Sequence, residues 1–98
     1  MGEQELPKEQ QLRTYFQAEM PAFRVDMEWK IDVHSFRFYF AEGHENRYIF
    51  ELDQDVLQER TVAELIQQIE RKHWKRVLEA HIGQVVRYSD NGFSFRAR

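Results

Sequence analysis

The sequence contains no cysteine, which excludes every chemistry that depends on a thiol. A disulfide framework, a cysteine-based zinc finger, an iron–sulfur cluster and a cysteine nucleophile all need that side chain. The chain also has only four glycines in 98 residues, and they are dispersed. A phosphate-binding loop needs clustered glycines, so no nucleotide cradle of that kind is predicted.

Long apolar runs are absent as well. No stretch approaches the roughly 20 apolar residues that a membrane-spanning helix needs. The first residues, Met1–Leu6, are acidic and polar, unlike the basic and apolar segments of a secretory signal. We therefore expect a cytoplasmic protein without membrane contact, in which residues 1–6 form a flexible tail.

Aromatic residues, in contrast, are abundant. Eight Phe, four Tyr and two Trp make up 14% of the chain, and hydrophobic residues make up 42%. This is enough to build a core and argues against disorder. The length suits one domain, which we expect to span residues 1–98.

The first half of the chain changes from helical to strand periodicity. Apolar residues at helical spacing between Pro7 and Pro21 predict a helix over residues 8–19. From Phe23 to Val33, apolar and charged residues alternate strictly, which predicts a strand with one apolar face. Two further strands are predicted around residues 36–40 and 47–52 by the same alternation.

The second half predicts a long helix and a hairpin. Thr61 and Glu64 form a capping-box pair, and Gly83 suits a C-terminal cap, so one helix of about 22 residues is expected. Asn91-Gly92 then predicts a two-residue hairpin turn. This turn would place Arg87 opposite Arg96, a like-charge pair that needs compensation.

The predicted order is α-β-β-β-α-β-β, a single small α+β domain with an antiparallel sheet and two helices packed on one face. Over residues 8–82 this order resembles that of double-stranded-RNA-binding domains, and the whole order resembles that of small acidic secretion chaperones. Both resemblances concern topology alone. The RNA-binding family opens its second helix with lysines, whereas this helix opens Thr61-Val62-Ala63-Glu64. We assign neither family.

No catalytic motif is visible. The three serines lie outside any nucleophile elbow, and the Glu70-x-x-His73 unit occurs once where a di-iron site needs two. His73 and His81 are eight residues apart, too far along a helix to share one metal ion. Asp53, Asp55 and Glu59 are interpreted as a turn and helix start. We therefore expect no enzyme, metal or cofactor.

Charge is distributed unevenly, and this gives one alternative function. Residues 1–60 carry seven basic and thirteen acidic side chains, whereas residues 61–98 carry seven basic and four acidic ones. A basic patch of this kind suits phosphate or an acidic partner, although a solvated helix face is the more common explanation. The candidate nucleic-acid residues are Arg71, Lys72, Lys75, Arg76, Arg87 and Arg96. Because the whole chain is acidic, nucleic acid is the less favoured partner.

The outer face of the predicted sheet gives the leading hypothesis. Arg37, Tyr39, Arg47 and Ile49 lie opposite the apolar face, and aromatic and Arg side chains together are typical of the centre of a protein interface. We expect a small non-catalytic interaction module, such as an adaptor, inhibitor or immunity-type protein. It would bind another protein through this face or a sheet edge. A homodimer is compatible with this interpretation because unpaired sheet edges favour pairing with another strand.

A small-ligand pocket between the long helix and the sheet, near His73 and Trp74, is the second alternative function.

Overall fold

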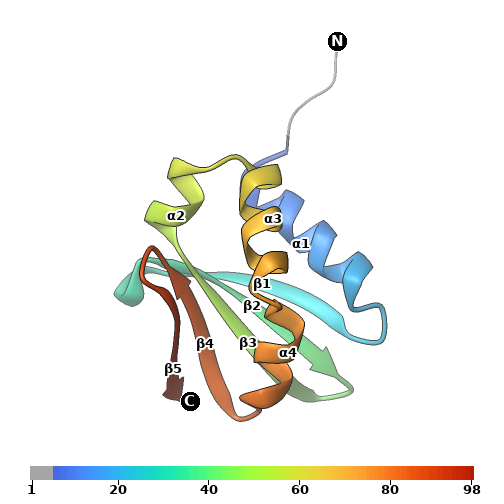
Figure 1. The fold of residues 1–98 in the computed structure, drawn as a ribbon. Coiled ribbons are helices and arrows are strands. Elements are labelled where there is room, and N and C mark those ends of the chain that lie inside the picture. Colours follow the sequence, from blue (N-terminus) through green and yellow to red (C-terminus); the bar gives the residue numbers. More distant parts are fainter. Residues whose placement is uncertain (1–5) are drawn as a thin grey trace.

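Three neighbouring strands follow the first helix in a simple antiparallel meander (Figure 1). The computed structural model describes residues 6–98, so most of the tail expected over residues 1–6 lies outside the described part. The elements of the first half are α1 (Lys8–Glu19), β1 (Arg24–Lys30), a 3-10 turn (Ile31–Val33), β2 (Ser35–Glu42) and β3 (Glu45–Asp53). The predicted helix over residues 8–19 is confirmed.

The chain then crosses one face of the sheet in three short helices and returns for a final hairpin. These elements are α2 (Gln54–Glu59), α3 (Val62–Arg71), α4 (Trp74–Ala80), β4 (Gln84–Ser89) and β5 (Gly92–Ala97). The result is a single compact α+β domain with an open five-stranded sheet in the order β1-β2-β3-β4-β5. The predicted fold class is confirmed, with helices packed on the sheet as expected.

One strand pair differs from the fully antiparallel prediction. β4 pairs with β3 in parallel, from Ile49 opposite Val85 to Leu52 opposite Tyr88. The helices between the two strands carry the chain back to the end of the sheet where β3 begins, and β4 must therefore run in the same direction as β3. The sheet is mixed but mostly antiparallel.

The predicted long helix is also divided. α3 ends at Arg71, and His73 adopts a left-handed conformation with φ of 58° before α4 begins. The buried residues explain the break: Ile69 and Trp74 are five apart, a spacing that turns Trp74 away from the buried stripe of a straight helix. The break returns Trp74 to the core. Together with the separate α2, residues 6–98 form four α-helices where two were expected.

Two smaller predictions are wrong in detail. The strand expected to continue to Val33 ends at Lys30, because a 3-10 turn and a left-handed His34 redirect the chain. In the last hairpin, Arg87 lies opposite Ser94 rather than Arg96. Only Gly92 has positive φ there, so the turn does not have the two left-handed residues of the predicted type.

The core lies between the helices and the sheet, and aromatic rings fill its centre. Phe16 of α1 contacts Phe38 and Phe50 edge-on at ring-centroid distances of 5.0 and 5.5 Å. Trp74 stacks on Phe50 at 6.3 Å and is 2% exposed. α1 and α4 are thereby fixed on the same sheet face, and the other face is left without helices. No helix within residues 6–98 is long and apolar enough to cross a membrane.

Candidate functional site

The outer sheet face is built around one buried carboxylate. Glu51 of β3 is 0% exposed although no helix covers it. It accepts hydrogen bonds from Arg37 on β2 at 2.6 and 2.9 Å, from Arg87 on β4 at 3.0 Å and from Arg96 on β5 at 2.9 Å. Four neighbouring strands therefore meet at this carboxylate. Its burial is produced by the arginine side chains that surround it.

The charge state of this cluster follows from its contacts. Burial by itself would raise the pKa of Glu51, but the hydrogen bonds from Arg96, Arg37 and Arg87 outweigh it and hold the pKa below its ordinary value. Burial would lower the pKa of Arg37, and its bond to Glu51 raises the pKa overall. Both groups stay ionised at neutral pH. The sequence signalled this cluster only indirectly, through the predicted pair of Arg87 and Arg96 in the last hairpin, which needed a compensating charge.

Three of the four residues predicted to bind a partner lie on the outer face, and the fourth, Arg47, lies at the irregularity in the β2–β3 pairing. Arg37 is bound to Glu51, and Tyr39 donates a hydrogen bond to Glu28 at 2.6 Å. Burial and this bond raise the pKa of the Tyr39 hydroxyl. Ile49 is only 6% exposed, while Arg47 is exposed at the start of β3. The structure therefore brings Arg37, Tyr39 and Ile49 together, but much of their surface is used within the chain.

The six candidate nucleic-acid residues do not form one surface. Arg87 and Arg96 lie on the outer sheet face, bound to Glu51, whereas the other four belong to the helix layer on the opposite face. Within that layer, Lys75 forms an ion pair with Glu19 at 2.7 Å. Arg71 and Lys72 line a hollow of about 460 Å³ together with Arg60, Gln68 and Tyr88.

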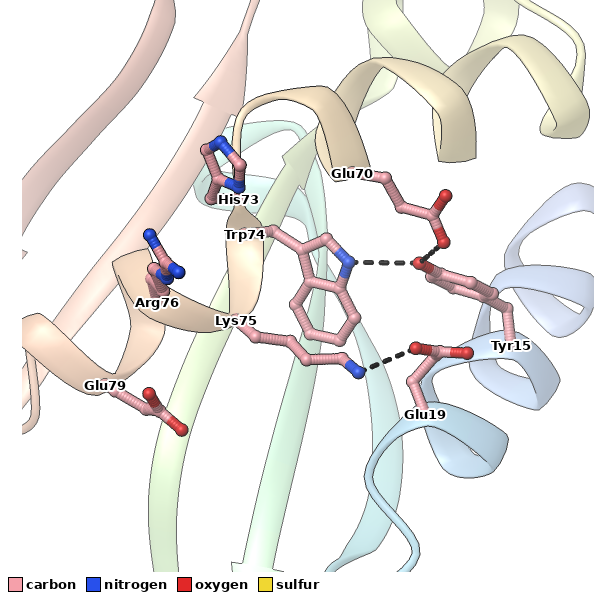
Figure 2. Close-up of a pocket in the computed structure, with 8 residues that line it drawn as sticks. All are labelled: Tyr15, Glu19, Glu70, His73, Trp74, Lys75, Arg76 and Glu79. Carbon is pink, nitrogen blue, oxygen red and sulfur yellow. Dashed lines mark hydrogen bonds and ion pairs between the residues drawn. The ribbon is translucent and has the colours of Figure 1, made fainter.

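His73 and Trp74, the candidate pocket residues, line a different hollow of about 450 Å³ (Figure 2). It opens between α1 and the α3–α4 break rather than between a helix and the sheet. The indole N–H of Trp74 donates to the Tyr15 hydroxyl at 3.0 Å, and Tyr15 donates to Glu70 at 2.6 Å. Burial and the bond to Glu70 raise the pKa of Tyr15, so this phenol remains protonated.

The polar groups along one side of this hollow form a chain of hydrogen bonds within the protein. Lys75 closes one side by its ion pair with Glu19, and its ammonium lies 5.9 Å from the Trp74 ring centroid. Sequence reasoning did not single out Tyr15, which packs against the core and also supplies the hydroxyl that joins Trp74 to Glu70. Within residues 6–98, no group of three or more potential metal ligands lies together.

The free edge of β1 is a third feature, and α1 covers only its first part. The backbone N–H of Val25 donates to the Gln17 side chain at 3.1 Å, and Arg13 donates to the Val25 carbonyl at 2.8 Å. Because alternate residues of an antiparallel strand direct their backbone groups to the same side, Met27 and Trp29 face this edge as well. Within the described chain, no hydrogen bond reaches their edge-facing groups.

Apolar side chains surround the uncovered part of this edge. Trp29 is 37% exposed and Ile31 is 77% exposed. The Trp29 ring contacts Phe36 at a centroid distance of 4.9 Å and His34 at 5.6 Å. We call Met27, Trp29 and Ile31 the open edge. It combines unpaired backbone groups with exposed apolar area, which isolated proteins generally avoid.

No family model, curated protein or solved structure matches this chain.

Proposed function

We propose that this protein is a non-catalytic interaction module that binds an extended segment of a partner protein chain at the open edge of β1. In this mode the segment adds a strand to the sheet: backbone hydrogen bonds supply affinity, and side-chain contacts supply specificity. One observation carries the proposal. α1 side chains satisfy the edge-facing groups of Val25, while those of Met27 and Trp29 are left open beside exposed apolar residues.

The outer sheet face and the hollow near Trp74 differ from the open edge, and the difference supports the choice of the edge as the binding site. On the outer face, Glu51 binds Arg37, Arg87 and Arg96. In the hollow between α1 and α4, the polar groups of Trp74, Tyr15 and Glu70 are hydrogen-bonded to one another. At the open edge, in contrast, a partner gains hydrogen bonds without breaking any within the chain. The sheet edge thus replaces the face around Tyr39 as the preferred site of the interaction module.

A proline at position 27 tests the proposal. Met27→Pro removes the edge-facing N–H, and the proline ring projects toward the incoming strand. The hydrogen-bond ladder between β1 and β2 does not use that N–H, so the pairing within the sheet is kept. Met27→Ala is the matched control, because it removes the same side chain and keeps the N–H. Tagged wild type and both variants are used to capture partners from untreated and nuclease-treated halves of a lysate of the source organism.

The proposal expects a protein that wild type and Met27→Ala retain and Met27→Pro loses. On adding that protein, hydrogen exchange at the Met27 and Trp29 amides slows. Equal recovery with both variants would exclude the open edge as the site. Recovery that disappears with nuclease would favour the nucleic-acid alternative instead, with its steep salt dependence.

A further inference from the structure

We propose that a second copy of this chain occupies the open edge, with the two β1 strands paired antiparallel about Trp29. This inference rests on the proposed function and names its partner. The assembly is a two-fold dimer in which two five-stranded sheets join edge to edge into one continuous sheet. The register follows from where the edge is open and from the charges that border it.

Two features limit how far the strands can overlap. The edge is occupied at Val25 by Gln17 and Arg13, and the 3-10 turn over Ile31–Val33 ends the strand. Pairing is therefore confined to residues 26–31. Within this window the outer-face residues are Asp26, Glu28 and Lys30, two acids followed by one base.

Each symmetric register opposes different charges. Pairing centred on Met27 would place Asp26 opposite the partner's Glu28. Pairing centred on Glu28 would place two glutamates opposite each other. It would also require the occupied Val25 to face the partner's Ile31. Directly opposed like charges disfavour the Met27 register. The Glu28 register also offers two Asp26–Lys30 pairs, and it is disfavoured because the edge-facing groups of Val25 are already bound by Gln17 and Arg13.

The register centred on Trp29 avoids these conflicts within the paired residues 26–31, and Asp26 faces Asp32 of the partner only beyond the ladder, in the 3-10 turn. It places Glu28 opposite the partner's Lys30, and by symmetry Lys30 opposite the partner's Glu28. Met27 and Trp29 are the hydrogen-bonding positions of the new ladder, so Glu28 and Lys30 lie at its close, non-hydrogen-bonded positions. Two cross-strand ion pairs therefore form where side chains approach most closely. Centring on Lys30 would instead oppose two lysines.

The same register also covers the exposed apolar residues. On the helix side of the sheet, Trp29 meets the partner's Trp29, and Met27 meets the partner's Ile31. These contacts remove from water the side chains that are 37% and 77% exposed in the isolated chain. The two Trp29 residues exchange a pair of N–H···O bonds, and the N–H of Ile31 reaches the partner's Met27 carbonyl on each side.

The other free edge does not offer this complementarity. β5 carries Arg96 on its outer face and has no acidic residue from Gly92 to Ala97. Pairing of two β5 strands would therefore provide no cross-strand ion pair. Of the two free edges, only β1 offers complementary charges to a second copy, so we assign self-association to β1.

Charge exchange tests the register. With Glu28→Lys alone, a lysine would face a lysine of the partner at two symmetric positions. With Lys30→Glu alone, a glutamate would face a glutamate at the same two positions. Each variant is expected to weaken the dimer at least about ten-fold, because two attractive pairs become repulsive. An equimolar mixture of the two variants restores both ion pairs, and a heterodimer forms. Sedimentation equilibrium over a concentration series measures each constant, and circular dichroism confirms that each variant is folded.

Two controls separate the dimer from changes within the chain. Tyr39→Phe removes the hydrogen bond to Glu28 and keeps its charge, so the dimer constant is expected to stay within about two-fold of wild type. Met27→Pro is expected to give a monomer, and Met27→Ala is expected to retain self-association.

The contradicting outcomes differ for this inference and for the proposed function. A monomeric wild type would overturn the second copy as partner, but would leave the capture experiment with Met27→Pro to decide the edge itself. A dimer abolished by Met27→Pro but not restored by mixing the charge variants would overturn the register. A dimer that Met27→Pro leaves intact would place self-association elsewhere and overturn this inference.

Discussion

Glu51 shows how one residue can organise a sheet face that no helix covers. Its carboxylate is fully buried and accepts hydrogen bonds from arginines on three other strands. When one partner is removed from a buried ion cluster, the remaining charges stay desolvated without compensation. The free-energy cost of that removal exceeds the net stabilisation that the intact cluster provides. The residue therefore holds the strands in register as well as neutralising their charges.

Glu51→Ala should be strongly destabilising for this reason. We expect the free energy of unfolding to fall by about 3 kcal/mol, measured by urea titration. Glu45→Ala, at the exposed start of the same strand, is the control and should stay within about 0.5 kcal/mol of wild type. Similar losses for both variants would contradict the role given to the cluster.

The lowered pKa of Glu51 also predicts a pH dependence. Its ionised form is favoured in the folded state, so its contribution to stability is complete above the ordinary value of 4.5. The contribution is lost as pH falls through the lower folded-state pKa. The melting temperature of wild type should therefore decrease more steeply below about pH 4.5 than that of Glu51→Gln. Parallel curves for the two proteins would refute this assignment.

The Tyr15 hydroxyl accepts from a buried indole and donates to Glu70. Tyr15→Phe leaves the Trp74 N–H without a partner, which should cost about 1–3 kcal/mol. For a domain of this size, a loss of 1 kcal/mol corresponds to roughly 4–8 °C in melting temperature. Thermal unfolding followed by Trp fluorescence measures the effect, and an unchanged melting temperature would show that the bond is unimportant.

At the scale of elements, the break between α3 and α4 decides where Trp74 packs. His73 has a left-handed φ of 58°, which is unfavourable for a residue with a side chain. The spacing of five between Ile69 and Trp74 was a visible signal, but apolar spacing alone did not show that the helix would break rather than rotate. Packing of Trp74 against Phe50 decided it.

His73→Gly should therefore stabilise the protein by about 0.5–1 kcal/mol, because glycine adopts this conformation without strain. Lys72→Gly is the matched control. Its φ of −95° suits any residue, so glycine there only increases the freedom of the unfolded chain and should lower stability. Calorimetric melting temperatures that moved in the same direction for both variants would contradict the strain at His73.

At the scale of the whole molecule, the sheet separates two polar clusters. The Glu51 cluster lies on the open face, whereas Tyr15, Glu70 and Trp74 belong to the helix-covered face, and the two share no hydrogen-bonding partner. Effects of substitutions that share no contacts add. Glu51→Gln combined with Tyr15→Phe should thus lose the sum of the single losses to within about 0.5 kcal/mol. A larger deviation in urea unfolding would reveal coupling through the sheet.

The sequence by itself determined the elements whose signals are local. Alternating apolar and polar residues predicted the first three strands, and apolar residues at helical spacing between two prolines predicted α1. The Thr61–Glu64 capping box predicted the start of α3. The faces of the strands followed as well, because side chains alternate with a fixed period of two.

Only the tertiary structure decided the features that depend on residues far apart in the chain. The parallel pairing of β3 and β4, the meeting of Arg37, Arg87 and Arg96 at Glu51, and the Tyr15–Trp74 contact join segments separated by up to 59 residues. The open edge is also of this kind, because α1 side chains cover Val25 and stop before Met27. Local periodicity carries no information about which strand becomes an edge or which side chains cover it; packing of the whole chain does.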